Sequence, residues 1–230
     1  MKHTLILSAV LGAIVAASAI SAQVPNAELA MKIVQGRKDN AAKMKNFTWN
    51  SRTELVRDGK TVDIRIDQVM YGPDGNLQRT LINNDSFTHP KGLLFRRIME
   101  QNKKEELEKY LKGLRALLDE YTLPTAGKVV DFMAAANVQF TSGPDGSPLL
   151  KIEGNGVVKP GDTLAIWADG NTHQMRKVQI TTNYEGGMAN VTATYKTLGS
   201  GITVMNMAEV ELPDKSMSLQ IHNYDYEPND

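Results

Sequence analysis

The most constraining feature of this sequence is a period of two in its apolar residues, repeated between short turns. Val62, Ile64 and Ile66 alternate with charged residues, and Val178 and Ile180 alternate with polar or charged ones. This alternation is typical of a strand with one buried face. The separating turn sequences are Asp58-Gly59, 72–75, 144–146, 159–162, 169–171, 185–187 and Pro213-Asp214. Turns this short join antiparallel neighbours, so the sequence predicts an antiparallel meander.

Other segments have helical spacing instead. The first predicted helix follows Asn26, which is an expected N-cap. An apolar stripe at 94–99 precedes a second helix over 105–121, whose leucines recur along one face until Pro124 ends the helix. A short third helix is predicted over 125–136. The predicted order is a helix, about three strands, two helices and about six or seven further strands.

This order predicts an α+β fold, because the apolar helix faces are what can cover the apolar face of the sheet. Two architectures fit. One is a flat sandwich of sheet and helices, and the other is a strongly curved antiparallel sheet, an open half-barrel, with helices covering its concave face. A sheet of about nine or ten twisted strands tends to curl. We therefore predict the curved sheet.

Residues 1–22 have the three parts of a secretory signal peptide. Lys2 gives a basic start, the run 5–19 is mainly apolar, and small residues follow up to Ala22. An uncleaved anchor is the alternative, but a spanning helix needs about 20 apolar residues, and this run is shorter. We expect 23–230 to be a single exported domain without a stable membrane anchor.

Composition removes several classes of function. The chain has 26 basic and 26 acidic residues and a net charge of +0, so it lacks the positive surface of a nucleic-acid binder. It has 0 cysteines, which excludes disulfides and cysteine metal sites, and its 4 histidines are not at metal-ligand spacing. We expect no metal and no cofactor.

Familiar catalytic motifs do not occur in the sequence. It contains no G-x-S-x-G, no H-E-x-x-H, no P-loop and no dinucleotide fingerprint. We therefore expect a protein that is not an enzyme. A hydrolase that uses a pair of carboxylates without a motif stays open as a third possibility.

Several short motifs resemble those of a known family. They are Phe47-Thr48-Trp49, Arg52-Thr53-Glu54, Tyr71-Gly72-Pro73-Asp74-Gly75, Arg79-Thr80, Lys159-Pro160-Gly161-Asp162 and Asn223-Tyr224. Together with the order of elements they resemble the LolA/LolB-like fold, which includes periplasmic carriers of bacterial lipoproteins. Among proteins with this fold, these motifs are most similar to those of a less characterised group of exported bacterial proteins. The resemblance implies an acyl-chain cavity between an open half-barrel and a helical lid.

That cavity defines the expected site and function. The predicted ligand-binding residues are Trp49, Ile64, Ile66, Leu107, Leu111, Leu114, Leu118, Val178, Ile180, Val191, Val204 and Leu219. We expect a periplasmic monomer that holds a lipid, an acyl chain or an acylated lipoprotein. The alternative is a protein-interaction or envelope-sensing module whose core is filled, because a helical leucine stripe is usually ordinary core.

Overall fold

A computed structural model describes residues 23–86, 94–122 and 125–229, so the predicted signal peptide at 1–22 lies outside the described residues. The helices are α1 (Gln23–Met44), α2 (Leu94–Glu120) and α3 (Ala126–Ala135). The strands are β1 (Phe47–Arg57), β2 (Lys60–Tyr71), β3 (Leu77–Ser86), β4 (Asn137–Ser142), β5 (Pro148–Asn155), β6 (Thr163–Asp169), β7 (Met175–Tyr184), β8 (Gly187–Thr197), β9 (Thr203–Leu212) and β10 (Met217–Pro228).

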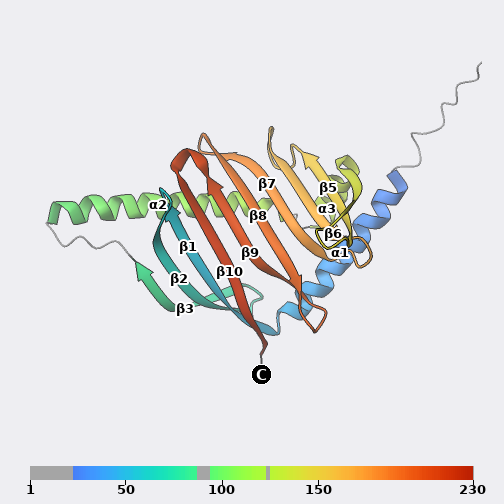
Figure 1. Cartoon of the computed structure of the whole chain (residues 1–230), viewed down its shortest axis with the longest axis horizontal. Helices are drawn as coiled ribbons and strands as arrows, with labels where there is room; N and C mark the ends of the chain where they lie inside the picture. Colours follow the sequence, from blue (N-terminus) through green and yellow to red (C-terminus); the bar gives the residue numbers. More distant parts are fainter. Residues whose placement is uncertain (1–22, 87–93, 123–124, 230) are drawn as a thin grey trace, which may run out of the picture.

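All of these strands belong to one antiparallel sheet of 10 strands in the order β3-β2-β1-β10-β9-β8-β7-β6-β5-β4. The first hairpin joins the long C-terminal meander where β1 pairs with β10. The edges β3 and β4 do not pair with each other, so the sheet stays open. Figure 1 shows the helices together on one face of the sheet. The predicted α+β fold, an open half-barrel with helices covering its concave face, is confirmed.

Turn chemistry explains why the hairpins close where they do. Asp58 and Gly59 both have positive φ, at 50° and 71°, and they connect the paired residues Arg57 and Lys60. This is the backbone of a tight two-residue hairpin, which an Asp-Gly pair adopts readily. The two turn residues favour this connection locally, and the backbone N–H of Asp58 also donates to the carbonyl of Ser216 at 2.8 Å.

The helix ends agree with the sequence in one case and differ in another. Thr125 caps α3, and its hydroxyl oxygen accepts the backbone N–H of Lys128 at 3.3 Å. By contrast, α1 begins at Gln23, so the prediction of Asn26 as its N-cap is wrong. Pro25 is compatible with this earlier start because a proline fits within the first turn of a helix.

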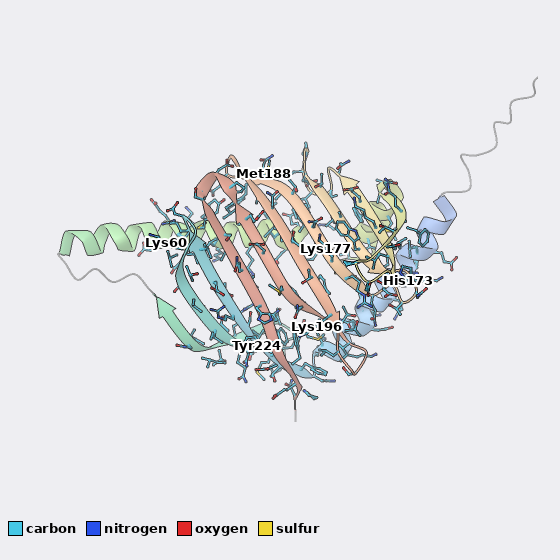
Figure 2. The ribbon with its side chains drawn as sticks, in the orientation of Figure 1. Lys60, His173, Lys177, Met188, Lys196 and Tyr224 are labelled. Carbon is cyan, nitrogen blue, oxygen red and sulfur yellow. The ribbon has the colours of Figure 1, made fainter. Side chains whose placement is uncertain are left out.

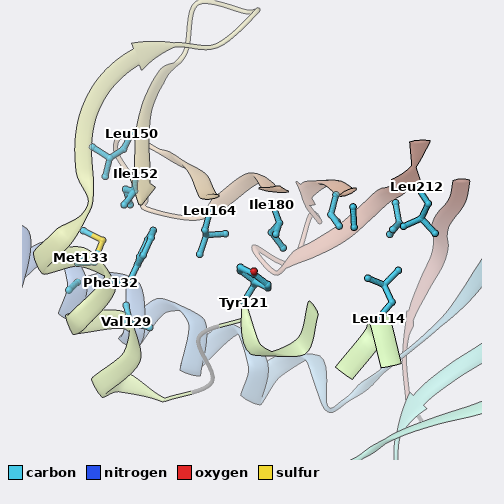
Figure 3. Packing of buried hydrophobic residues seen from close by; sticks show 14 of the residues in the cluster. Leu114, Tyr121, Val129, Phe132, Met133, Leu150, Ile152, Leu164, Ile180 and Leu212 are labelled. Atoms are coloured by element: carbon cyan, nitrogen blue, oxygen red, sulfur yellow. The ribbon is translucent and has the colours of Figure 1, made fainter. Parts of the chain in front are cut away.

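The main core lies between the concave face and the three helices, as Figure 3 shows. Two glycines allow the helices to approach closely. A Cβ on Gly154 of β5 would lie 2.6 Å from the ring of Phe132 on α3. A Cβ on Gly113 of α2 would overlap the hydroxyl of Tyr184 on β7. In the first contact a ring of α3 rests on the backbone of β5, and in the second a ring of β7 rests on the backbone of α2.

The other face of the sheet is mainly polar. Figure 2 views this convex face with the helices behind it, and Lys177, Met188 and Tyr224 extend from it. Trp167 is half-buried there between two cross-strand lysines, with the ammonium of Lys151 5.4 Å and that of Lys177 4.9 Å from its ring centroid. These contacts cover the ring without help from another layer.

Candidate functional site

The concave face is apolar along continuous cross-strand rows. Residues that are directly opposite in an antiparallel pair lie on the same face. One row crosses from β5 to β10 through Ile152, Ile166, Val178, Ala193, Ala208 and Ile221. A second row contains Leu164, Ile180, Val191, Val210, Leu219 and, on β1, Leu55. These rows form a surface on which an apolar ligand or an apolar helix face can pack.

Helix α2 covers these rows with its leucine stripe, but its side chains are buried to different degrees. Leu114 is 2% exposed and Tyr110 is 8% exposed. Partly buried leucines flank them, namely Leu107, Leu111, Leu117 and Leu118. The ring of Tyr110 meets that of Tyr184 edge-on at 4.9 Å. The helix thus packs on the sheet along a narrow line and leaves apolar surface on both sides of it.

Eight of the residues predicted to bind a ligand lie together in this cluster. They are Leu107, Leu111, Leu114, Leu118, Val178, Ile180, Val191 and Leu219. Trp49 and Val204 lie in a second cluster with Met44 at the end of α1. Trp49 stacks there on Tyr226 at 5.6 Å. The predicted set is therefore divided between two clusters.

The structure corrects the placement of Ile64 and Ile66. In β2, it is Arg65 that lies opposite Thr53, and Asp63 that lies opposite Leu55. Leu55 belongs to the apolar rows, so these charged residues share the concave face and the isoleucines lie on the convex one. The alternation of β2 was identified correctly, but around Ile64 and Ile66 it is the charged residues that face inward, and the inward face becomes apolar again only at Val69.

The inward charged residues form a cluster that the sequence analysis missed. Asp67 is 2% exposed, and both of its carboxylate oxygens accept the Nε–H of Arg65 at 2.9 Å. Arg79 of β3 lies 3.9 Å from the same carboxylate. The signal in the sequence was the alternating set of charged residues in β2. This set had been assigned to the solvent-facing side of the strand because the residues between them are apolar.

A polar anchor holds the C-terminal end of α2. The hydroxyl of Tyr121, directly after the helix, donates to the carboxylate of Asp162 at 2.6 Å and lies 2.8 Å from the hydroxyl of Thr182. Asp162 also accepts three backbone N–H groups, those of Val157, Val158 and Lys159, at 2.6–2.9 Å. The turn that contains Asp162 thereby fastens the helix to the edge of the sheet's concave face.

Burial and hydrogen bonding act in opposite directions on the pKa of Asp162. Burial alone would raise this pKa, but the Tyr121 hydroxyl and the three N–H groups lower it below its ordinary value. The pKa of Tyr121 is raised, first by burial and then by the hydrogen bond to the carboxylate. Both groups therefore keep their ordinary neutral-pH ionisation, with Asp162 charged and Tyr121 protonated.

Two hollows in the described chain lie beside α3, and no leucine of the α2 stripe lines either of them. One of about 30 Å³ lies between α1, α3 and strands β5 to β7, and this is room for about one water molecule. A wider hollow of about 320 Å³ lies between α3 and the segment 154–158, and charged residues such as Lys128 and Asp131 contribute to its lining. Beneath α2, the buried side chains of Tyr110 and Leu114 belong to the main core cluster, so a ligand can enter there only if the helix moves.

No protein-family model and no curated protein matches the chain. Its structure is similar to that of a DUF1329 family protein from Desulfovibrio piger ATCC 29098, with 8% identity and a TM-score of 0.40 over 90% of this chain and 93% of that one. None of the helices in the described part of the chain combines the length and the hydrophobicity that a membrane-spanning segment requires.

Two further solved structures are similar. One is a domain assigned to outer membrane lipoprotein sorting from Vibrio parahaemolyticus, with 11% identity and a TM-score of 0.39 over 88% of this chain and 93% of that one. The other is a LolA superfamily protein from Nitrosomonas europaea, with 10% identity and a TM-score of 0.40 over 87% of this chain and 94% of that one. At these values the likeness is one of overall architecture, and it assigns no ligand, partner or site residue.

Proposed function

We propose that this protein is a periplasmic, non-enzymatic binding protein that holds the acyl chain of a lipid or of an acylated protein between the concave face and α2. The observation that carries this proposal is the unequal attachment of α2. The helix has a polar anchor at Tyr121, whereas its other described contacts with the sheet are mainly apolar. A helix held in this way can swing about its anchored end.

Apolar burial supplies the binding energy in this mechanism. Each CH₂ group that leaves water contributes about 0.8 kcal/mol. The concave rows and the leucine stripe present no charged group between β5 and β10, so they need no directed chemistry to hold a chain. When α2 lifts, an acyl chain replaces the helix against the sheet, and the half-buried leucines then cover the chain.

The first test is lipid extraction and mass spectrometry of the mature protein purified from a bacterial periplasm. We expect a stoichiometric acyl lipid that is absent from an unrelated exported protein purified in parallel. A protein that yields no lipid, and that also fails to take up oleate or its neutral alcohol when these are added, would contradict the carrier and favour the filled interaction module.

Leu111→Asp tests whether α2 is the cover. Leu111 is half-buried, so the variant should fold, and the charge should abolish retention of the acyl chain under the helix. Val130→Asp is the matched control, because Val130 lies on α3 and is 37% exposed. Circular dichroism checks the fold of both. If Leu111→Asp retains lipid as the control does, α2 is not the cover; if it unfolds, the helix is core.

A further inference from the structure

The apolar rows end abruptly where β1 meets β2. Across six strand spacings, from β5 to β1, they extend for about 29 Å along the sheet at ~4.8 Å per strand. On β2, the first row reaches Arg65 after Thr53 of β1, and the second row reaches Asp63 after Leu55. A bound acyl chain that follows the rows would therefore place one of its ends beside charged side chains, and this asymmetry bears on what its head group can be.

The charged end has more cations than anions. Arg65 and Arg79 both pair with the one buried carboxylate of Asp67. Arg115 of α2 is exposed and directly follows Leu114, which is buried against the sheet. Burial first, and then Arg115, lower the pKa of Arg79. Arg65 and Arg79 thus share one carboxylate, and with Arg115 the three guanidinium groups outnumber the two carboxylates of Asp67 and Asp63.

Two buried polar atoms beside this cluster have no partner. Ser51 lies opposite Asp67 on one side and opposite Asn223 on the other, so all three share the concave face. Among the described residues, nothing hydrogen-bonds the hydroxyl oxygen of Ser51 or the side-chain oxygen of Asn223, although these residues are 1% and 5% exposed. Unpaired polar atoms at such depth are costly, and a polar ligand would remove that cost.

We propose that Arg65, Arg79 and Arg115, with Ser51, bind the oxyanion head group of an amphiphile, a carboxylate or a phosphate, whose acyl chain lies along the apolar rows. This inference rests on the proposed function and narrows its ligand to anionic amphiphiles. Planar guanidinium groups suit such oxyanions because they donate two parallel hydrogen bonds. The hydroxyl of Ser51 is placed to donate a further one.

The experiment compares ligands that share one chain and differ in the head group. Equilibrium dialysis measures the binding of oleate, oleoyl lysophosphatidate and the neutral oleyl alcohol to the wild-type mature protein. We expect at least one of the anions to bind about tenfold more tightly than the alcohol, and we expect this preference to shrink as sodium chloride is added. The tighter anion identifies the head group as carboxylate or phosphate.

Three variants test the residues. Arg115→Gln and Arg79→Gln should each reduce anion binding about threefold to tenfold and leave binding of the alcohol unchanged. Ser51→Ala should also weaken anion binding while the protein keeps or gains thermal stability, because an unpaired buried hydroxyl is removed. Arg52→Gln is the matched control, since Arg52 pairs with Glu54 on the convex face of the adjoining strand.

The outcomes separate this inference from the function on which it rests. If neither the anions nor the alcohol bind, the acyl-chain site itself is absent. If all three ligands bind equally to the wild type, the acyl-chain site stands and the head-group site is overturned. An anion preference that survives in Arg115→Gln and Ser51→Ala as it does in Arg52→Gln also overturns it. Arg115 is exposed, and the hydroxyl of Ser51 has no hydrogen bond among the described residues, so these variants remain informative if Arg79→Gln does not fold.

Discussion

Tyr121 and Asp162 join α2 to the sheet through one hydrogen bond of 2.6 Å. In Tyr121→Phe, the carboxylate loses its only side-chain donor among the described residues and Thr182 loses its partner. We expect the free energy of unfolding to fall by about 1.5–3 kcal/mol, the usual contribution of a hydrogen bond to a charged group. Urea denaturation measures this change. Tyr224→Phe, on the convex face, removes a hydroxyl that has no hydrogen bond in the described chain and should be nearly neutral.

The same substitution has a pH dependence whose sign follows from the two pKa shifts. The pKa of Asp162 is lowered by folding, so its contribution to stability is present above its ordinary value of 3.8 and is lost as the pH falls through the folded value. The pKa of Tyr121 is raised, so its contribution is present below 10.0 and is lost only as the pH rises through the folded value. The stability difference between wild type and Tyr121→Phe should be flat near neutral pH and shrink below about pH 4. A constant difference down to pH 2 would contradict the pairing.

Single residues could be predicted where the interaction is local. Asp58-Gly59 forms its hairpin and Thr125 caps α3 because each acts within three residues of itself. The turn at 159–162 was also recognised, but the role of Asp162 was not. Its partner Tyr121 is 41 residues away in the sequence, and only the folded chain brings the two together.

At the scale of elements, the contact between α2 and β7 depends on the absence of a side chain at Gly113. In Gly113→Ala, the new methyl group overlaps the hydroxyl of Tyr184, so we expect a lower melting temperature despite the better helix propensity of alanine. Tyr184→Phe removes that hydroxyl, and the double variant should recover most of the loss. A double-mutant cycle measures the coupling free energy.

Gly36→Ala provides the contrast for this cycle. Gly36 lies in α1 with open space around the added methyl group, so the helix propensity alone acts and stability should rise by up to about 1 kcal/mol. If Gly113→Ala stabilises the protein as Gly36→Ala does, the close contact between α2 and β7 is not part of the folded state.

The helices and strands themselves were largely predictable from the sequence. Which set of alternating side chains in a strand faces the concave side was not always predictable. A period of two identifies a strand and separates its two faces. It does not say toward which face the sheet curves. In β2 the cross-strand register places Arg65 beside Thr53 and turns Ile64 and Ile66 outward. Pairing with β1 set this orientation, and that long-range register is absent from the pattern of β2 alone.

For the whole molecule, a movable α2 implies that helix and sheet open separately. The 10 strands share a continuous ladder of backbone hydrogen bonds, whereas α2 meets the sheet through side chains. Opening of α2 therefore breaks few interactions compared with opening of the sheet. We expect amides within 105–118 to exchange with solvent through an opening of lower free energy than those of β7 and β8. Native-state hydrogen exchange measures both.

Tyr121→Phe tests whether α2 swings about the end that Tyr121 anchors. The substitution loosens only the anchored end of α2, so hydrogen exchange in 105–118 should accelerate. The opening free energy of the central strands should fall only by as much as the free energy of global unfolding falls. Bound oleate should slow the helix amides in the same segment, because the leucine stripe then packs on the acyl chain and opening of the helix must also release the ligand. If helix and strands exchange with one common free energy in wild type and variant alike, they unfold as a single unit. The concave face would then be a filled core, and the interaction module would describe the protein better than the carrier.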